Sequence, residues 1–240
     1  MSTAESLVDD PDCLSFFSSR GISPESIKKA RVGFINRDFP IIDDHIESHI
    51  SCNGDVKCDY CRFKNWFYWE RSGEVTCRFS KYVLFPLTDF KNRVTGFSLR
   101  GVEKKSFESF LSRRDFNAVI FKTTDAIRES YEQDSIWIVE GPLDLLSMAE
   151  VGVHNSVAIM TNNLSRNQTK WVKRISDRFY LAMDADEAGN LGASNARIRF
   201  GESNCKRIKW NQHFQCKDMN DLLRKLGPNK LRNLLDGEMT

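Results

Sequence analysis

Three short hydrophobic runs in the second half of the chain alternate with helical segments, and this alternation limits the possible folds more than any other feature. The runs read SIWIV from residue 135, SVAIM from residue 156 and FYLAM from residue 179. Buried parallel strands are short, almost entirely apolar and joined by helices. The sequence therefore predicts an α/β fold in which residues 131–240 form a parallel sheet, with a further short strand at 207–210.

The first half of the chain has a different pattern of apolar and polar residues. An apolar run at residues 82–87, a polar turn at 89–93 and a second run at 94–99 predict a β-hairpin. Ser23 followed by Pro24 is typical of a helix N-terminus. We therefore expect an α+β subdomain over residues 1–130, ahead of the parallel sheet.

Composition places the chain among ordinary globular proteins, because 40% of its residues are hydrophobic and 28% are charged. No apolar run approaches the length that crosses a bilayer, and the first residues have neither a basic nor an apolar signal region. We expect a cytoplasmic protein without a membrane partner. Lys and Arg exceed Asp and Glu by only 35 to 33, so local clusters must indicate any nucleic-acid binding.

Acidic residues follow the predicted strands. Glu140 ends the first run, and Asp144 lies in the first turn of the next helix. Asp184 and Asp186 follow the third run, and Asp218 lies at a later strand-to-helix junction. The carboxyl ends of parallel strands meet at one edge of a sheet, where α/β proteins bind ligands. Strand alternation predicts that the side chains of Asp184 and Asp186 point the same way.

Clustered carboxylates repel one another unless a hard cation neutralises them. Mg²⁺ is commonly held by a few carboxylates, by water and by substrate phosphates. Any one of these acids alone is more often a helix cap or a solvated charge. Together they predict a site for Mg²⁺ or Mn²⁺ that is suited to phosphoryl transfer.

Two of these motifs resemble a known family. The segments VEGPLD at 139–144 and MDADEAG at 183–189, in this order, resemble the Toprim domain of bacterial-type primases, type IA and II topoisomerases and some nucleases. The resemblance implies a Rossmann-like sheet with Glu140, Asp184 and Asp186 as catalytic metal ligands. It also implies Asp144 and Asp218 as supporting metal ligands.

Residues outside the acidic motifs resemble one branch of that family. The segments RGISPESI at 20–27, VGF at 32–34, FPL at 85–87 and NRVTGFSLRG at 92–101 resemble the RNA-polymerase domain of DnaG-type and phage primases. The resemblance implies DNA-templated RNA primer synthesis, with single-stranded DNA and ribonucleoside triphosphates as partners. A replicative helicase is expected to be a separate protein, since the sequence has no GxxxxGK[ST] loop.

By the same resemblance, basic residues are expected to contact phosphates. The candidates for template or nucleotide contacts are Arg93, Arg100, Lys104 and Lys122. Solvated surface charge is the alternative interpretation, because exposed lysines and arginines are common.

The chain departs from the family pattern at two places. Residues 160–163 read MTNN where the family usually has glycine and threonine, and Asn220 stands where cellular primases usually carry a second aspartate. The asparagine resembles the single-chain primases of T-odd phages, which indicates a phage or mobile-element protein. Metal binding at that position is then expected to be weaker or differently shared.

Four of the seven cysteines cluster, with one CxxC pair, in an irregular segment at 45–80. We expect them to hold one structural Zn²⁺, because such clusters bind metal more often than they form disulfides in a reducing compartment. Unligated thiols are the alternative, and His45 or His49 could replace one ligand. The four cysteines are Cys52, Cys58, Cys61 and Cys77.

Two rival functions share these features. A RecR-like protein binds DNA without polymerising nucleotides, and a Toprim nuclease uses the same metals to cut phosphodiesters. A topoisomerase is not expected, because it would need a nucleophilic tyrosine on a further large domain, for which these 240 residues leave no room.

Overall fold

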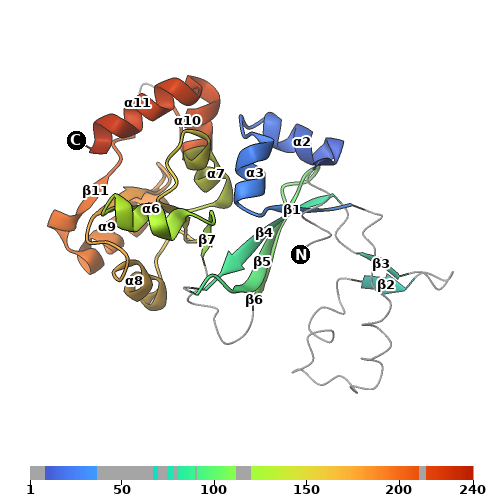
Figure 1. The fold of residues 1–240 in the computed structure, drawn as a ribbon, viewed down its shortest axis with the longest axis horizontal. Coiled ribbons are helices and arrows are strands. Elements are labelled where there is room, and N and C mark those ends of the chain that lie inside the picture. Colours follow the sequence, from blue (N-terminus) through green and yellow to red (C-terminus); the bar gives the residue numbers. More distant parts are fainter. Residues whose placement is uncertain are drawn as a thin grey trace, which may run out of the picture.

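Two β-sheets of four and five strands form the framework of the protein, and a separate two-stranded ribbon accompanies them (Figure 1). The computed structural model describes residues 9–36, 67–69, 75–77, 81–89, 91–111, 120–210 and 215–239. The four-stranded sheet belongs to the first half of the chain and the five-stranded sheet to the second half.

The five-stranded sheet has the order β11-β10-β8-β9-β7. Its four parallel members are β8, β9, β10 and β11, and the first three coincide with the predicted apolar runs, so the predicted α/β class is confirmed. β7 is antiparallel to β9. The predicted strand at 207–210 was placed too late, because pairing with β10 begins at Cys205 and ends at Arg207. The strands are β7 Phe121–Lys122, β8 Ile136–Val139, β9 Ser156–Ala158, β10 Phe179–Ala182 and β11 Cys205–Arg207.

Helices cover both faces of this sheet, which explains why β8, β9 and β10 are buried along their whole length. Alternate residues of β8 enter different cores: Ile138 packs with α8 and α9, whereas Trp137 packs with α7, α10 and α11. The Trp137 and Tyr180 rings stack with centroids 4.5 Å apart. The helices are α6 Ala126–Glu132, α7 Pro142–Glu150, α8 Arg166–Val172, α9 Glu187–Phe200, α10 Met219–Leu226 and α11 Pro228–Met239, with a 3-10 turn at Glu202–Asn204.

The four-stranded sheet is antiparallel, with the order β1-β4-β5-β6. The predicted hairpin is confirmed, since β4 pairs with β5. Its turn is held by Asp89, whose Oδ1 accepts hydrogen bonds from the backbone N–H groups of Lys91 at 2.8 Å and Arg93 at 3.0 Å. The strands are β1 Gly33–Ile35, β4 Tyr82–Thr88, β5 Val94–Gly101 and β6 Phe107–Leu111.

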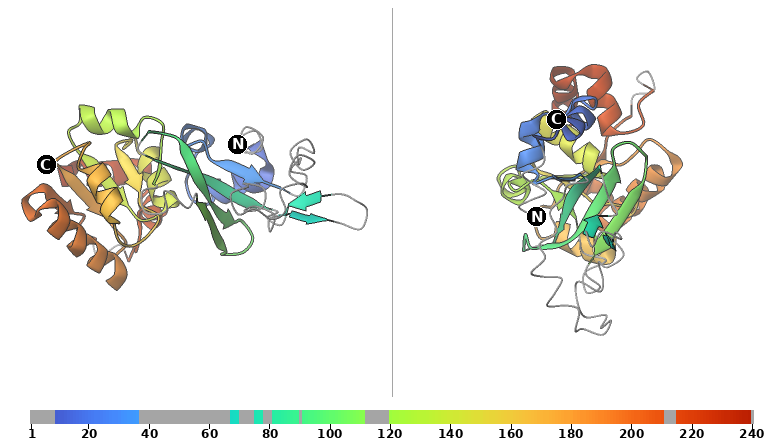
Figure 2. Two further views of the ribbon diagram at one scale, coloured as in Figure 1. Left: turned by 90° about the horizontal axis from the view of Figure 1, so that it is seen from below. Right: turned by 90° about the vertical axis from the view of Figure 1, so that its right-hand side faces the viewer.

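Two short helices near the N-terminus, α2 (Pro11–Ser18) and α3 (Pro24–Lys29), share a buried core with the second half of the chain (blue in Figure 2). The predicted helix start at Ser23 is confirmed, because its hydroxyl accepts from the backbone N–H of Ser26. Phe17 and Ile27 belong to the same buried core as α7 of the larger sheet. The division at residue 130 stays a prediction, and β7, which precedes it, belongs to the larger sheet.

Most of the cysteine cluster lies outside the described residues, namely Cys52, Cys58 and Cys61. Cys77 ends β3 (Val75–Cys77), which pairs with β2 (Phe67–Trp69) in the two-stranded ribbon. The zinc site therefore stays a prediction. None of the helices in the described part of the chain is long and apolar enough to cross a membrane.

Candidate active site

A cavity of about 520 Å³ is lined by residues from both halves of the chain. Its acidic residues come from the carboxyl ends of β8 and β10 and from the starts of α7 and α10, and they are Glu140, Asp144, Asp184, Asp218 and Asp221. Its basic residues are Arg20, Arg100, Lys105, Lys217 and Arg224. Acidic and basic groups thus share one open chamber.

Parallel pairing brings Glu140 and Asp184 together. β8 and β10 are neighbours in register, with Val139 opposite Ala182, so both carboxylates follow at the same sheet edge. Glu140 Oε1 accepts a hydrogen bond from the backbone N–H of Asp184 at 3.1 Å. Gly189 permits this approach, because a Cβ atom there would lie 2.2 Å from the Asp184 carbonyl oxygen and 2.8 Å from Glu140 Oε1.

Glu140, Asp184 and Asp218, here called the acidic edge, concentrate negative charge that nearby basic residues offset only in part. Burial, and then the charges of Glu140, Asp218 and Asp186, raise the pKa of Asp184 to about 7. Burial also raises the pKa values of Glu140 and Asp218. A cation among these groups would favour their ionised forms, because opposite charge offsets the cost of desolvation.

Asp144 has a bracing role that the sequence did not reveal. Its side chain is buried, and Oδ1 accepts from the backbone N–H groups of Met219 at 3.1 Å and Asn220 at 3.3 Å. Oδ2 accepts from the N–H of Gly141 at 3.2 Å. Burial, followed by repulsion from Asp218 and Asp184, raises the pKa of Asp144 well above its ordinary value. Asp144 therefore ties the start of α7 to the start of α10, and its predicted metal role stays a prediction.

Asp186 and Asp218 both cap helices. Asp186 Oδ1 accepts from the N–H of Gly189, and Asp218 Oδ1 accepts from the N–H of Asp221, each at 2.8 Å. Asp218 lines the cavity, but Asp186 is exposed and does not. That Asp184 and Asp186 point the same way stays a prediction, as does the metal role of Asp186, but strand alternation cannot support it. β10 ends at Ala182, so strand alternation does not extend to these residues.

These oxygen donors suit a hard cation that is not fully enclosed by protein. Among the residues that the structure describes, no three His, Cys, Asp or Glu side chains form a ready-made metal cage. Mg²⁺ usually takes one or two carboxylates and completes its shell with water and substrate phosphates. Glu140, Asp184 and Asp218, which line one cavity, fit that pattern of ligands.

Arg100 is held at the cavity by aromatic rings. Its guanidinium carbon lies 5.0 Å from the centroid of Phe107 and 5.7 Å from that of Phe16. The guanidinium of Arg20 lies 3.7 Å from the Phe16 centroid. Within the described ranges, no side chain forms a hydrogen bond or ion pair with Arg100. Its five donors are thus available to a ligand.

The other predicted phosphate contacts do not line the cavity. Arg93 Nε donates to Asp89 Oδ2 at 2.7 Å in the hairpin turn, and Lys104 is exposed. Lys122 is buried beside a separate cavity of about 100 Å³, where burial lowers its pKa to about 8. The sequence reasoning missed Arg20, Lys105, Lys217 and Arg224 as lining residues, although Arg20 opens the primase-like segment at 20–27 and Lys105 adjoins Lys104.

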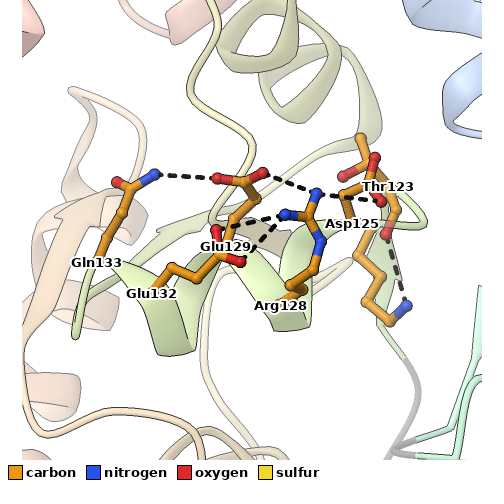
Figure 3. A network of polar contacts seen from close by, with 7 residues as sticks. Thr123, Asp125, Arg128, Glu129, Glu132 and Gln133 are labelled. Atoms are coloured by element: carbon orange, nitrogen blue, oxygen red, sulfur yellow. Dashed lines mark hydrogen bonds and ion pairs between the residues drawn. The ribbon is translucent and has the colours of Figure 1, made fainter.

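A polar network on α6 is separate from the site. Arg128 pairs with Asp125, Glu129 and Glu132, and Gln133 donates to Glu129 at 3.3 Å (Figure 3). None of these residues lines the cavity. Exposed pairs of this kind contribute little to stability, because water and salt screen them. The basic residue of α6 is therefore no candidate for substrate binding.

Two family models match the chain in the order of its two halves. The model of the DNA primase catalytic core, N-terminal domain, matches residues 4–121, and a Toprim-like model matches residues 137–223. The chain belongs to the Toprim-domain, DnaG-type primase family. The predicted resemblance is therefore confirmed, and neither match favours a RecR-like protein or a nuclease.

Individual primases agree with this assignment. The chain is 24% identical over 226 residues to a DNA primase of Listeria monocytogenes, covering 92% of this chain and 35% of that protein. It thus spans about a third of the length of this relative. The crystal structure of the Aquifex aeolicus primase contains its zinc-binding and RNA polymerase domains. Its similarity covers 96% of this chain and 57% of the Aquifex chain, with a TM-score of 0.73 and 22% sequence identity. The structure of a DnaG primase catalytic domain bound to single-stranded DNA is similar over 98% of this chain and 77% of that domain's chain, with a TM-score of 0.71 and 18% sequence identity.

Proposed function

We propose that this chain synthesises RNA primers on single-stranded DNA, using ribonucleoside triphosphates and Mg²⁺ or Mn²⁺. The observation that carries the proposal is the cavity, where the carboxylates of Glu140, Asp184 and Asp218 share one chamber with Arg20 and Arg100. Phosphoryl transfer depends on positioning and on neutralising phosphate charge, which this combination can provide.

The acidic edge would hold the cation. Glu140, Asp184 and Asp218, which line the cavity, are proposed ligands together with Asp186, whose charge acts on Asp184, and Asp144 is a proposed supporting ligand. The bound cation would activate the attacking 3′-hydroxyl and stabilise the departing pyrophosphate. Arg207 keeps the edge in place, since its guanidinium donates to the carbonyl oxygens of Gly189 at 2.8 Å and Asp184 at 3.0 Å.

The basic residues would bind phosphates of the template and the nucleotides. Arg100 has unused donors, and Lys105 and Arg224 are exposed at the cavity. Burial and the charges of Arg100 and Arg224 lower the pKa of Arg20, so these cations repel one another and an anionic ligand would relieve the repulsion. Guanidinium groups suit phosphate oxygens because two N–H groups can donate to them in parallel.

Further proposals concern the partners and origin of the protein. A separate helicase would provide the single-stranded template, and Cys52, Cys58, Cys61 and Cys77 would hold one structural Zn²⁺. Metal analysis of the purified protein tests the zinc assignment, with one equivalent expected. A phage or mobile-element origin stays a proposal that rests on Asn220 and residues 160–163.

The test is incorporation of labelled ribonucleotides on single-stranded DNA with Mg²⁺ or Mn²⁺, with and without candidate helicases. We expect short RNA products from the wild type and none from Asp184→Asn. Binding without synthesis or cutting would support the RecR-like alternative. Metal-dependent cutting of the DNA would instead support a nuclease.

A further inference from the structure

Phe107 presents an aromatic ring to solvent at the cavity. Its side chain is 53% exposed, which makes it one of four large hydrophobic residues so exposed in the described part of the chain. It begins β6, the edge strand of the four-stranded sheet. Scattered exposed hydrophobic residues need no explanation, but Phe107 also lines the cavity, which Tyr131, Leu191 and Ile198 do not.

Strand register explains why Phe107 faces the cavity. In the pairing of β5 with β6, Phe107 lies opposite Arg100, and Ser109 lies opposite Ser98. These four side chains line the cavity, whereas Leu99 belongs to the opposite, buried face. Alternate residues of a strand share a face, so aromatic, basic and hydroxyl groups form one continuous wall.

Arg100 places a positive charge beside the Phe107 ring. The guanidinium lies over the Phe107 ring at 5.0 Å from its centroid, and the remaining ring surface is open. Proteins that bind single strands combine cationic groups for the backbone with aromatic rings on which bases stack. Arg100 and the neighbouring Lys105 supply the cationic part beside this ring.

We propose that the ring of Phe107 is a stacking platform for an unpaired template base, while Arg100 binds an adjacent phosphate. The assignment rests on the proposed primase function and names a template contact within it. A template base is favoured over the base of a free nucleotide because Phe107 lies on an edge strand of the sheet, whose residues Ser109 and Phe107 line the cavity in succession, so that a nucleic-acid strand can run along them.

The experiment measures binding of labelled single-stranded oligonucleotides to the 240-residue chain and its variants. Loss of a base stack costs affinity by roughly 5- to 150-fold, and the partial exposure of the ring favours the lower end. Phe107→Ala and Phe107→Leu should therefore weaken binding about fivefold or more, while Phe107→Trp should retain it. Tyr131→Ala, which removes a comparably exposed ring from α6, should not change affinity.

Two further measurements separate stacking from charge. An oligonucleotide with abasic positions should bind wild type and Phe107→Ala equally. Phe107→Ala should leave the slope of log affinity against log salt unchanged, whereas Arg100→Ala should reduce it by about 0.7, the contribution of one phosphate contact on a single strand.

Each contrary result has its own meaning. Equal affinity of wild type and Phe107→Ala for the intact oligonucleotide overturns the stacking role and leaves the primase proposal standing. Weaker binding of ribonucleoside triphosphate but not of DNA assigns the ring to the incoming nucleotide and overturns the template assignment. Absence of any DNA binding by the wild type at low salt overturns both proposals.

Discussion

Asp184→Asn should stabilise the metal-free protein while it removes activity. The carboxylate has a pKa of about 7 against an ordinary value of 3.8, because it is half-buried among other acids. Ionising it in the folded state would cost about 4 kcal/mol without solvent screening, and about 2 kcal/mol once screening is allowed for. Asparagine keeps the shape and removes this cost. A gain of that size raises the Tm of a chain this long by about 4–8 °C.

The pH dependence follows from the sign of the pKa shift. A raised pKa means that the folded state favours protonated Asp184, an advantage that is complete below pH 3.8 and lost as the pH rises through about 7. The stability gap between Asp184→Asn and wild type should therefore be absent near pH 4, grow up to pH 7 and stay constant above it. Thermal unfolding in a chelator across this pH range measures the gap.

Two controls complete the experiment. Asp177 is exposed just before β10, at the opposite end of the strand from Asp184, so Asp177→Asn should leave stability unchanged. Excess Mg²⁺ at pH 8 should close the gap, because a ligand that binds only the folded wild type stabilises it. A variant no more stable than wild type at pH 8 in chelator would refute the repulsion argument, as would a gap of equal size at pH 4.

Three further predictions concern Gly189, Asp144 and Lys122. Gly189→Ala should lower both the stability measured by thermal unfolding and primer synthesis, because the added Cβ atom would clash with the backbone of Asp184. Gly237→Ala is the control: its Cβ atom would have no neighbour within 4 Å, so its stability should be unchanged or higher. Asp144→Ala should cost about 2–4 kcal/mol in urea unfolding, because three backbone N–H groups lose their acceptor, and Asp144→Asn should cost less. Lys122→Met should raise stability at pH 7 by about 1–3 kcal/mol, since the buried amine has a lowered pKa, and unchanged primer synthesis would contradict its predicted phosphate contact.

The acidic edge could be predicted from the sequence because its geometry is local to the sheet. Short apolar runs identify parallel strands, and parallel strands that are neighbours must bring their following residues together. Glu140 and Asp184 satisfy this rule through the pairing of β8 with β10. The rule does not extend to Asp186, which lies beyond the end of β10, caps α9 and does not line the cavity.

The basic residues that line the cavity could not be predicted in the same way, because tertiary packing brings them together from distant parts of the chain. Arg20 follows α2, Arg100 lies on β5 and Arg224 lies on α10, so more than 200 residues separate the first from the last. No period or spacing relates these positions. Arg93 and Lys122 had equally suitable sequence contexts, but neither lines the cavity. Arg93 donates to Asp89 in the hairpin turn, and Lys122 is buried elsewhere.

Asn220 connects the basic and acidic parts of the site. Its side-chain amide donates to the Arg20 carbonyl oxygen at 3.1 Å and to Ser147 Oγ at 2.9 Å, and its backbone N–H donates to Asp144. An ionised aspartate has no proton to donate and would face the Arg20 carbonyl with a like partial charge. The departure from the cellular-primase pattern thus exchanges a carboxylate for a donor that fixes Arg20 beside the cavity. The proposed cation would then have Asp218 as its carboxylate at this junction, with fewer negative charges around it, while Asn220 attaches the junction to the N-terminal half.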